Sequence, residues 1–152
     1  MSAFSLIKVT EMSIKELLFS FQGRVNRRTF WIWNAFYYLA IMLVATLLRK
    51  FYPAGIGVIL PACLLLMVLP DLAITAKRWH DRNKSNRFLL LNIPVILGRF
   101  TVPVGGTIAQ HQPTTVETII SLLALVCGGW ILLECGFLKG DTAENRYGRP
   151  QI

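Results

Sequence analysis

KRWHDRNKSNR, from Lys77 to Arg87, is a polar stretch between two long apolar regions, and the rest of the chain is organised around it. It holds five of the sixteen Lys and Arg residues and one of the two histidines. We name this stretch the polar island. Apolar regions on both sides of so compact a group of charges predict membrane helices joined by a short polar connection.

The composition supports a membrane protein. With 54% hydrophobic and 16% charged residues, and a mean hydropathy of +0.52, the chain of 152 residues is too apolar for an ordinary soluble domain. The net charge of +8 would also suit a nucleic-acid partner. Basic residues that flank apolar spans are what membrane orientation requires, however, so we predict an integral membrane protein and no nucleic acid.

The cysteines give no sign of a cofactor. They lie in apolar stretches without the paired spacing of a metal site, which favours small buried side chains over a disulfide framework or a zinc centre. The three are Cys63, Cys127 and Cys135. We predict no metal and no cofactor.

Four apolar runs predict an all-α integral membrane four-helix bundle, forming one domain over residues 1–152. Twenty uncharged residues at about 1.5 Å each cover a hydrocarbon core of roughly 30 Å. The predicted spans are 29–48, 54–76, 88–104 and 116–138, followed by a cytoplasmic tail at 139–152.

The segment before the first span, residues 1–22, contains a helix signal. Ser13 followed by Glu16 matches a capping box. Apolar residues then recur at helical spacing, at Ile14, Leu17, Leu18 and Phe21. We predict a short amphipathic interfacial helix on the membrane surface. A helix packed on the rest of the protein is the alternative, since both need the same apolar stripe.

The third apolar run is interrupted by Arg99. Either Arg99 snorkels from a continuous span over 88–104, which we prefer, or the helix breaks near Pro94 and Gly98. The following segment, 105–115, is predicted to be a loop.

The distribution of basic residues predicts the orientation. An even number of spans puts both termini on one side, and that side holds thirteen of the sixteen Lys and Arg residues. The other three are Arg49, Lys50 and Arg99. Because cytoplasmic loops carry the Lys and Arg excess, we predict that both termini and the polar island are cytoplasmic.

Three polar segments share a pattern with a known family. They read FQGRVNRRTFW at 21–31, KRWHDRNKS at 77–85 and GDTAENRYG at 140–148. Their order and content resemble the bacterial domain-of-unknown-function 805 family, the YhaH-like inner-membrane proteins. Members of that family show a Phe-x-Gly-Arg-x-x-Arg-x-x-Phe-Trp motif, an Arg-Arg-Leu-His-Asp loop and an Asn-Arg-Tyr-Gly motif.

The chain departs from the family pattern in a few places. Lys77 stands for the usual first arginine of the loop, Trp79 for the leucine, and Arg87 with Phe88 for a pair of tryptophans. The 105–115 loop is also longer than usual. The resemblance implies a bacterial inner-membrane location, and it implies no activity.

All three segments lie on the predicted cytoplasmic side, so we expect them to meet in one polar surface. Asp71 and Glu134 lie inside spans near that side, where a charge is costly without a partner. We expect them to pair with Lys77, Arg78 or the Arg24–Arg28 group, either to lock the bundle or to serve binding. The candidate binding cluster is Gly23, Arg24, Arg27, Asp71, Arg78, His80, Asp81, Ser85, Glu134, Asn145, Arg146 and Tyr147.

The His80-Asp81 dipeptide raises the question of catalysis, since a histidine beside a carboxylate can serve acid-base or metal chemistry. Adjacent residues point in different directions on a helix, and the other histidine, His111, is predicted across the membrane. No nucleophile elbow, phosphate loop or His-Glu-x-x-His helix is present in the sequence. We predict no enzyme, with a membrane enzyme built on this dipeptide as the alternative.

The function that these observations favour is docking at the cytoplasmic face. The expected partners are membrane lipids, anionic headgroups above all, with a protein partner or a second copy of the chain as further candidates. The alternative is a small oligomeric transporter or channel subunit that uses Asp71, Glu134 and Arg99 along a polar route. No ligand or pathway follows from the sequence.

Overall fold

The structure, a computed structural model, describes residues 12–101 and 112–150, and these residues form helices and no strand. The predicted all-helical class is confirmed for them. Two short 3-10 helices, η2 and η3, and a π-helix, η5, accompany the α-helices. The elements are α1 (Ile14–Phe19), α2 (Arg27–Phe51), η2 (Pro53–Gly55), α3 (Ile56–Asp81), η3 (Asn86–Leu91), α4 (Asn92–Thr101), α5 (Thr115–Ile131) and η5 (Leu132–Phe137).

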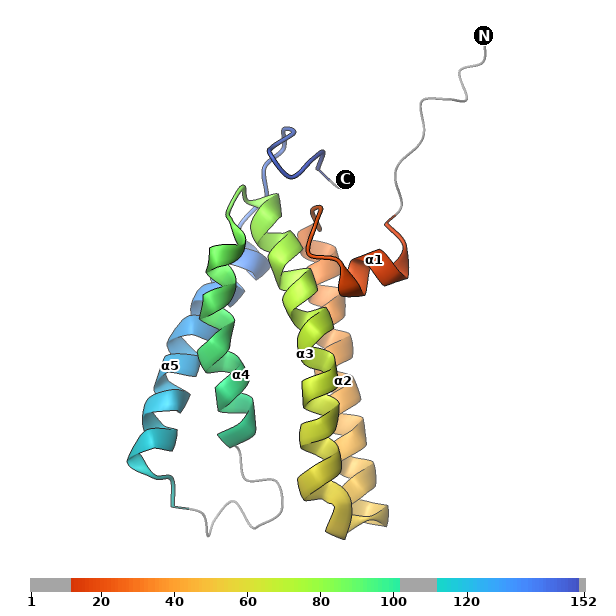
Figure 1. Ribbon diagram of the computed structural model, residues 1–152, viewed down its shortest axis with the longest axis vertical. Coiled ribbons are helices and arrows are strands. Elements are labelled where there is room, and N and C mark those ends of the chain that lie inside the picture. Colours follow the sequence, from red (N-terminus) through yellow and green to blue (C-terminus); the bar gives the residue numbers. More distant parts are fainter. Residues whose placement is uncertain (1–11, 102–111, 151–152) are drawn as a thin grey trace.

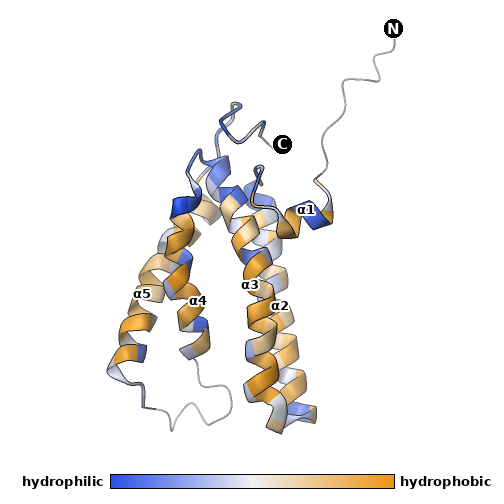
Figure 2. Cartoon of the chain, in the orientation of Figure 1, coloured by the Kyte–Doolittle hydropathy of each residue, from blue (hydrophilic) through white to orange (hydrophobic). Residues whose placement is uncertain are grey.

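The long helices form two pairs (Figure 1). α2 packs along α3, and α4 packs against α5. The pairs meet at the end where the C-terminal tail lies, and α1 lies across α3 near this end. Figure 2 shows hydrophilic residues gathered there, whereas the helix bodies are mostly hydrophobic. We name this region, made of residues 20–26, 77–87 and 138–150, the polar end.

Three helical stretches in the described part of the chain are long and apolar enough to cross a membrane. They correspond to the predicted spans at 29–48, 54–76 and 116–138. Their apolar side chains are widely exposed, as at Leu66 (78%) and Leu125 (72%), and a helix that is apolar on most faces suits a lipid environment. The three stretches are Arg27–Phe51, Pro53–Asp81 and Thr115–Phe137.

The predicted third span, 88–104, differs in the structure. Its described part is divided between η3 and α4, and residues 102–104 lie outside the described residues. Most of the predicted 105–115 loop, with His111, lies outside them too. α4 has 10 residues, so it is about 15 Å long, half of a hydrocarbon core. The predicted third span, 88–104, therefore stays a prediction.

Arg99 on α4 turns toward α3. Its Nη1 donates a hydrogen bond to Oδ2 of Asp71 at 2.8 Å, and its guanidinium carbon lies 4.7 Å from the ring centre of Tyr37. The preferred prediction, an Arg99 that snorkels toward water, is therefore wrong. The reason is that a carboxylate on the facing helix supplies an opposite charge within reach, which neutralises the cation inside the bundle.

α3 continues five residues beyond the predicted end of its span at Ala76, because it ends at Asp81. The first part of the polar island is therefore helical, and it is also buried. Burial is greatest where the start of α2, the end of α3 and η5 meet. The buried apolar cluster extends from there along α2 and α3, and its members are Val25, Phe30, Trp33, Tyr37, Leu64, Ile74, Trp79, Ile131 and Cys135.

α1 begins with the predicted capping box. Ser13 Oγ accepts from the backbone N–H of Glu16 at 3.2 Å, and Glu16 Oε2 accepts from the backbone N–H of Ser13 at 3.0 Å. The hydrogen bond from that backbone N–H, with one from the Ser13 hydroxyl, holds the pKa of Glu16 below its usual range. Leu17 and Leu18 pack on the core, whereas Ile14 and Phe19 are exposed. A place for α1 on a membrane surface stays a prediction.

The packing of α4 on α5 depends on Gly98. A Cβ at this position would lie 2.9 Å from Cβ of Ala124, so we expect Gly98→Leu to destabilise the protein by about 1–3 kcal/mol through overpacking. Thermal unfolding in detergent measures this. Gly57→Leu is the matched control, because a Cβ there meets nothing within 4 Å. Equal melting temperatures for the two variants would contradict the close packing.

Candidate functional site at the polar end

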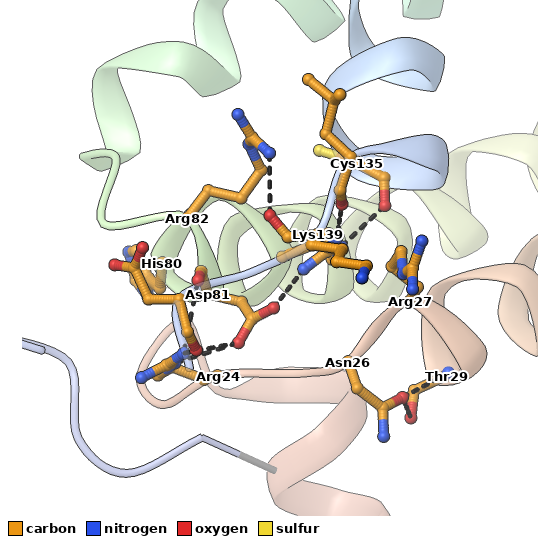
Figure 3. A network of polar contacts seen from close by, with 12 residues as sticks. Arg24, Asn26, Arg27, Thr29, His80, Asp81, Arg82, Cys135 and Lys139 are labelled. Atoms are coloured by element: carbon orange, nitrogen blue, oxygen red, sulfur yellow. Dashed lines mark hydrogen bonds and ion pairs between the residues drawn. The ribbon is translucent and has the colours of Figure 1, made fainter. Parts of the chain in front are cut away.

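The polar end is built around the carboxylate of Asp81, which two buried arginines share. Arg24 donates from Nε and Nη2 to Oδ1 at 3.0 and 2.9 Å (Figure 3). Arg78 donates from Nη1 to Oδ2. Both guanidinium groups are fully buried, and the Asp81 side chain is 7% exposed. Two cations on one anion leave one positive charge to be balanced by backbone oxygens.

The turn before α2 places Arg24. Gly23 has a φ of 90°, a conformation that glycine adopts without steric cost. Asn26 then caps α2 by accepting from the backbone N–H of Thr29 at 2.9 Å. Between them, the backbone N–H of Val25 donates to the carbonyl oxygen of Lys77 at 3.3 Å. The turn is thus fixed at both ends, and the arginine side chain points at the end of α3.

Arg24 also binds the C-terminal tail. Its Nη1 donates to the carbonyl oxygens of Ala143 and Gly148 at 2.9 and 3.0 Å, and its Nη2 donates to that of Asp141 at 2.5 Å. Gly140 lies so close to Asp81 that a Cβ there would be 1.8 Å from Oδ2. Only glycine fits at this close approach, and one guanidinium ties the tail to α3.

The end of η5 is held through its backbone. Helix ends leave carbonyl oxygens without helical partners, and these carry partial negative charge. Five consecutive carbonyl oxygens, from Cys135 to Lys139, each accept from a side chain of another segment. The donors are Arg78 Nε to Cys135 (2.6 Å), Trp31 Nε1 to Gly136 (3.0 Å), Arg27 Nη1 to Phe137 (3.0 Å), Arg78 Nη2 to Leu138 (2.5 Å) and Arg82 Nη1 to Lys139 (2.9 Å).

His80 is enclosed by the three family segments. Its Nδ1 lies 3.1 Å from the carbonyl oxygen of Gly23, and its Nε2 lies 2.7 Å from the side-chain oxygen Oδ1 of Asn86. The ring stacks on Tyr147, with centroids 3.7 Å apart and planes inclined by 6°. Asn145 donates from Nδ2 to the carbonyl oxygen of His80 at 3.0 Å. Both ring nitrogens are therefore engaged inside the protein.

Lys77 fastens α1. Its ammonium group donates to the carbonyl oxygens of Leu17, at 2.9 Å, and of Ser20, at the C-terminal end of α1. The lysine is fully buried. A cation at the carboxyl end of a helix is favoured by the unpaired carbonyl oxygens there, so Lys77 adds a polar link between α1 and α3 to the packing of Leu17 and Leu18.

Asp71 and Glu134 have other partners than the predicted ones. Asp71 pairs with Arg99 and also accepts from Trp33 Nε1 at 3.1 Å. It precedes Asp81 by ten residues on α3, about 15 Å along the helix, so the arginines around Asp81 are out of reach. The predicted pairing of Asp71 with Lys77, Arg78 or the Arg24–Arg28 group is wrong.

Glu134 pairs with two residues of the island's second half. Its carboxylate lies 2.7 Å from Arg82 Nε and 2.8 Å from Lys84 Nζ. The predicted partners are wrong here too, because Arg78 is already taken by Asp81 and by the carbonyl oxygens of η5. Glu134 nevertheless contacts the polar end through these two residues, as its position near the end of the span predicted.

The remaining predicted residues lie at the rim of the polar end. Arg146 donates from Nη2 to the carbonyl oxygen of Asn83 at 2.8 Å, and Ser85 is the residue just before η3. Of the twelve predicted residues, the structure places all except Asp71 at or beside the polar end. Whether any of them binds a ligand stays a prediction.

Sequence reasoning missed several contributors. Two of them are Asn86, which contacts His80, and Gly140, which contacts Asp81. Both lie in or beside the three family motifs, so the motifs could have indicated them. The carbonyl oxygens of η5 carry no side-chain signature at all. Among residues 12–101 and 112–150, no group of three or more His, Cys, Asp or Glu side chains could hold a metal ion.

The fold and the polar end together define a class of protein. Its described residues are all-helical, include three helices fit to cross a membrane, and are locked at one end by buried ion pairs. The family model described as "Protein of unknown function (DUF805)" matches residues 18–149, and the chain belongs to that family, as the resemblance predicted. This range contains all three motifs.

Curated relatives agree with this assignment. Uncharacterized protein YiiR of Escherichia coli strain K12 is 29% identical over 146 residues, which cover 91% of this chain and 90% of the relative. The protein of the same name from Escherichia coli O157:H7 matches equally well. No solved structure matches.

The Asp81 carboxylate provides a test of the network. We expect Asp81→Asn to destabilise the protein by about 3–5 kcal/mol, because it leaves Arg24 and Arg78 buried without their anion. Unfolding in detergent measures this. The control is Glu144→Gln, which breaks an exposed 3.6 Å pair with Arg149 and is expected to cost about 0–1 kcal/mol. Similar losses for the two variants would contradict a central role for Asp81.

Proposed function

We propose that the protein is a multi-pass protein of the bacterial inner membrane whose polar end faces the cytoplasm and binds anionic lipid headgroups. Support for the location comes from the three apolar helices, the family and the excess of basic residues at this end. Support for the partner comes from the cations that the polar end leaves unused.

The buried cations do not supply the binding surface. The guanidinium groups of Arg24 and Arg78 and the ammonium group of Lys77 are occupied by carboxylate or carbonyl oxygens inside the protein. They are better suited to hold the surface together than to meet a ligand. On this proposal, the family motifs shape the polar end, and other residues contact the partner.

A set of exposed cations surrounds the buried network, and it is the observation that carries the proposal. Within the part of the chain that the structure describes, four exposed basic side chains at or beside the polar end make no hydrogen bond or ion pair with the protein. They are Lys15, Arg28, Arg87 and Lys139. A basic residue near an anionic membrane surface contributes about 1 kcal/mol of attraction.

Exposed apolar side chains beside these cations favour lipid over a soluble partner. Ile14 and Phe19 flank Lys15 on α1, and Trp31 follows Arg28 on α2. α1 lies across α3 rather than along it (Figure 1), as a helix in the plane of an interface would. Cations and apolar groups side by side match the boundary between headgroups and acyl chains.

The alternative function, a transporter or channel subunit that uses Asp71, Glu134 and Arg99, has less support than lipid binding. Asp71 and Arg99 line one cleft of the bundle, whereas Glu134 pairs with Arg82 and Lys84 and does not line it. A single polar route through all three predicted residues therefore lacks a geometric basis in the described chain.

The role of the exposed cations is tested with two double variants, each of which removes two positive charges. We expect Arg28→Gln with Arg87→Gln to weaken the stabilisation of the purified protein by phosphatidylglycerol by about 2 kcal/mol, or roughly 30-fold in apparent affinity. The measurement is the melting temperature during lipid titration, with phosphatidylcholine as the neutral reference.

The matched control is Arg49→Gln with Lys50→Gln at the far end of α2. It is expected to keep the response to phosphatidylglycerol. Equal weakening by the two double variants would mean that only total charge counts, and would sink the proposed site.

The orientation has its own test. We expect a reporter that is active only in the cytoplasm to be active when fused after Ile152, and a periplasm-only reporter to be inactive there. The physical reason is the thirteen basic residues on that side. Activity of the periplasmic reporter would overturn the proposed orientation.

A further inference from the structure

We propose that the cleft between the α2–α3 pair and the α4–α5 pair binds a lipid-soluble molecule with an apolar chain and an uncharged head that carries carbonyl oxygens. The cleft has a volume of about 600 Å³ and is lined by residues of all four helices. Its size falls in the range of small-molecule sites. It is separate from the polar end and from the exposed cations proposed above to meet headgroups.

The walls of the cleft are apolar and its floor is polar. Tyr38, Leu125 and Leu132 line the walls and are exposed on the outer surface of the bundle, so the cleft is open toward the apolar surroundings. Asp71 and Arg99 also line the cleft, and because their side chains are only 9% and 18% exposed we name them its floor. Apolar walls around a few polar groups are the usual pattern of a site that holds an apolar molecule in a fixed orientation.

The hollow exists because α5 has glycine where a side chain would fill it. Gly128 and Gly129 both line the cleft. A Cβ at Gly128 would lie 3.6 Å from Val95 Cγ2, and a Cβ at Gly129 would meet nothing within 4 Å. Two adjacent glycines lower the stability of a helix interior, by roughly 0.5–1 kcal/mol each relative to alanine, so the space has a cost.

Arg99 supplies unused donors at the floor. A guanidinium has five N–H groups, and within the described residues only Nη1 has a hydrogen-bond partner, Oδ2 of Asp71. The side-chain amides of Asn34 and Asn92, which also line the cleft, donate to the carbonyl oxygens of Phe30 and Leu89. The free N–H groups of Arg99 therefore lack an acceptor, and a carbonyl oxygen supplies one without adding a charge.

The head is expected to be uncharged because the floor is already neutral. Asp71 and Arg99 balance each other, and both Asp71 oxygens are engaged, one by Arg99 and one by Trp33. A further charge in an apolar cleft would remain without a counter-ion, which is costly. Two kinds of membrane molecule combine an apolar chain with an uncharged head that carries carbonyl oxygens. They are isoprenoid quinones and neutral glycerolipids, whose carbonyl oxygens belong to esters.

The first experiment fills the cleft. Purified protein is titrated with decylubiquinone, with dioctanoylglycerol and with dodecane, which has the chain and no carbonyl, and binding is followed by melting temperature. We expect saturable stabilisation by at least one carbonyl ligand and none by dodecane. We expect Gly129→Leu to weaken that binding at least tenfold, while Gly57→Leu, an equal change outside the cleft, leaves it unchanged.

The second experiment removes the floor. Asp71→Asn with Arg99→Met deletes the guanidinium without leaving a charge unpaired, and we expect it to abolish the preference for the carbonyl ligand over dodecane. If decylubiquinone binds with the higher affinity, the ligand class is a quinone. If dioctanoylglycerol binds with the higher affinity, the ligand class is a glycerolipid. The inference is overturned if neither carbonyl ligand saturates, if dodecane stabilises equally, or if Gly129→Leu binds like the wild type. None of these outcomes depends on the response to phosphatidylglycerol.

Discussion

The sharing of one buried carboxylate, that of Asp81, by Arg24 and Arg78 is the contact on which the other contacts of the polar end depend. Arginine suits this role because its planar group donates in several directions at once. Each guanidinium donates to Asp81 and also to backbone oxygens, Arg24 to those of the C-terminal tail and Arg78 to those at the end of η5. Three parts of the chain far apart in sequence are thereby fixed at one point.

Backbone carbonyl oxygens explain why so much positive charge is buried with so few carboxylates. The five oxygens from Cys135 to Lys139 and those of the tail act as a diffuse anion, and they are available because η5 ends there. For these contacts to form, η5 must end beside the start of α2 and the end of α3. The combined length of α5 and η5 must therefore bring the last carbonyl oxygens of η5 to the level of Arg78 on α3.

The sequence predicted the apolar helices well, because length and hydropathy alone decide them: α2, α3 and α5 with η5 overlap the predicted spans. It also predicted the meeting of the three motifs at one end. It did not predict the partners of Asp71 and Glu134, since helix depth and competition for Arg78 decide these and neither is visible in spacing. α4 was the hardest element, because whether Arg99 faces water or Asp71 depends on its neighbour α3.

The buried cations also bear on how such a chain would be made. On the proposed orientation, Arg24, Lys77 and Arg78 are free charges while the chain is being inserted, and they help retain their segments in the cytoplasm. After folding, the same three side chains are enclosed and no longer face solvent. The charges that set topology at synthesis would then become the fastening of the finished fold. A chain with one span left out of the membrane would place the three segments on opposite sides, and its polar end could not close.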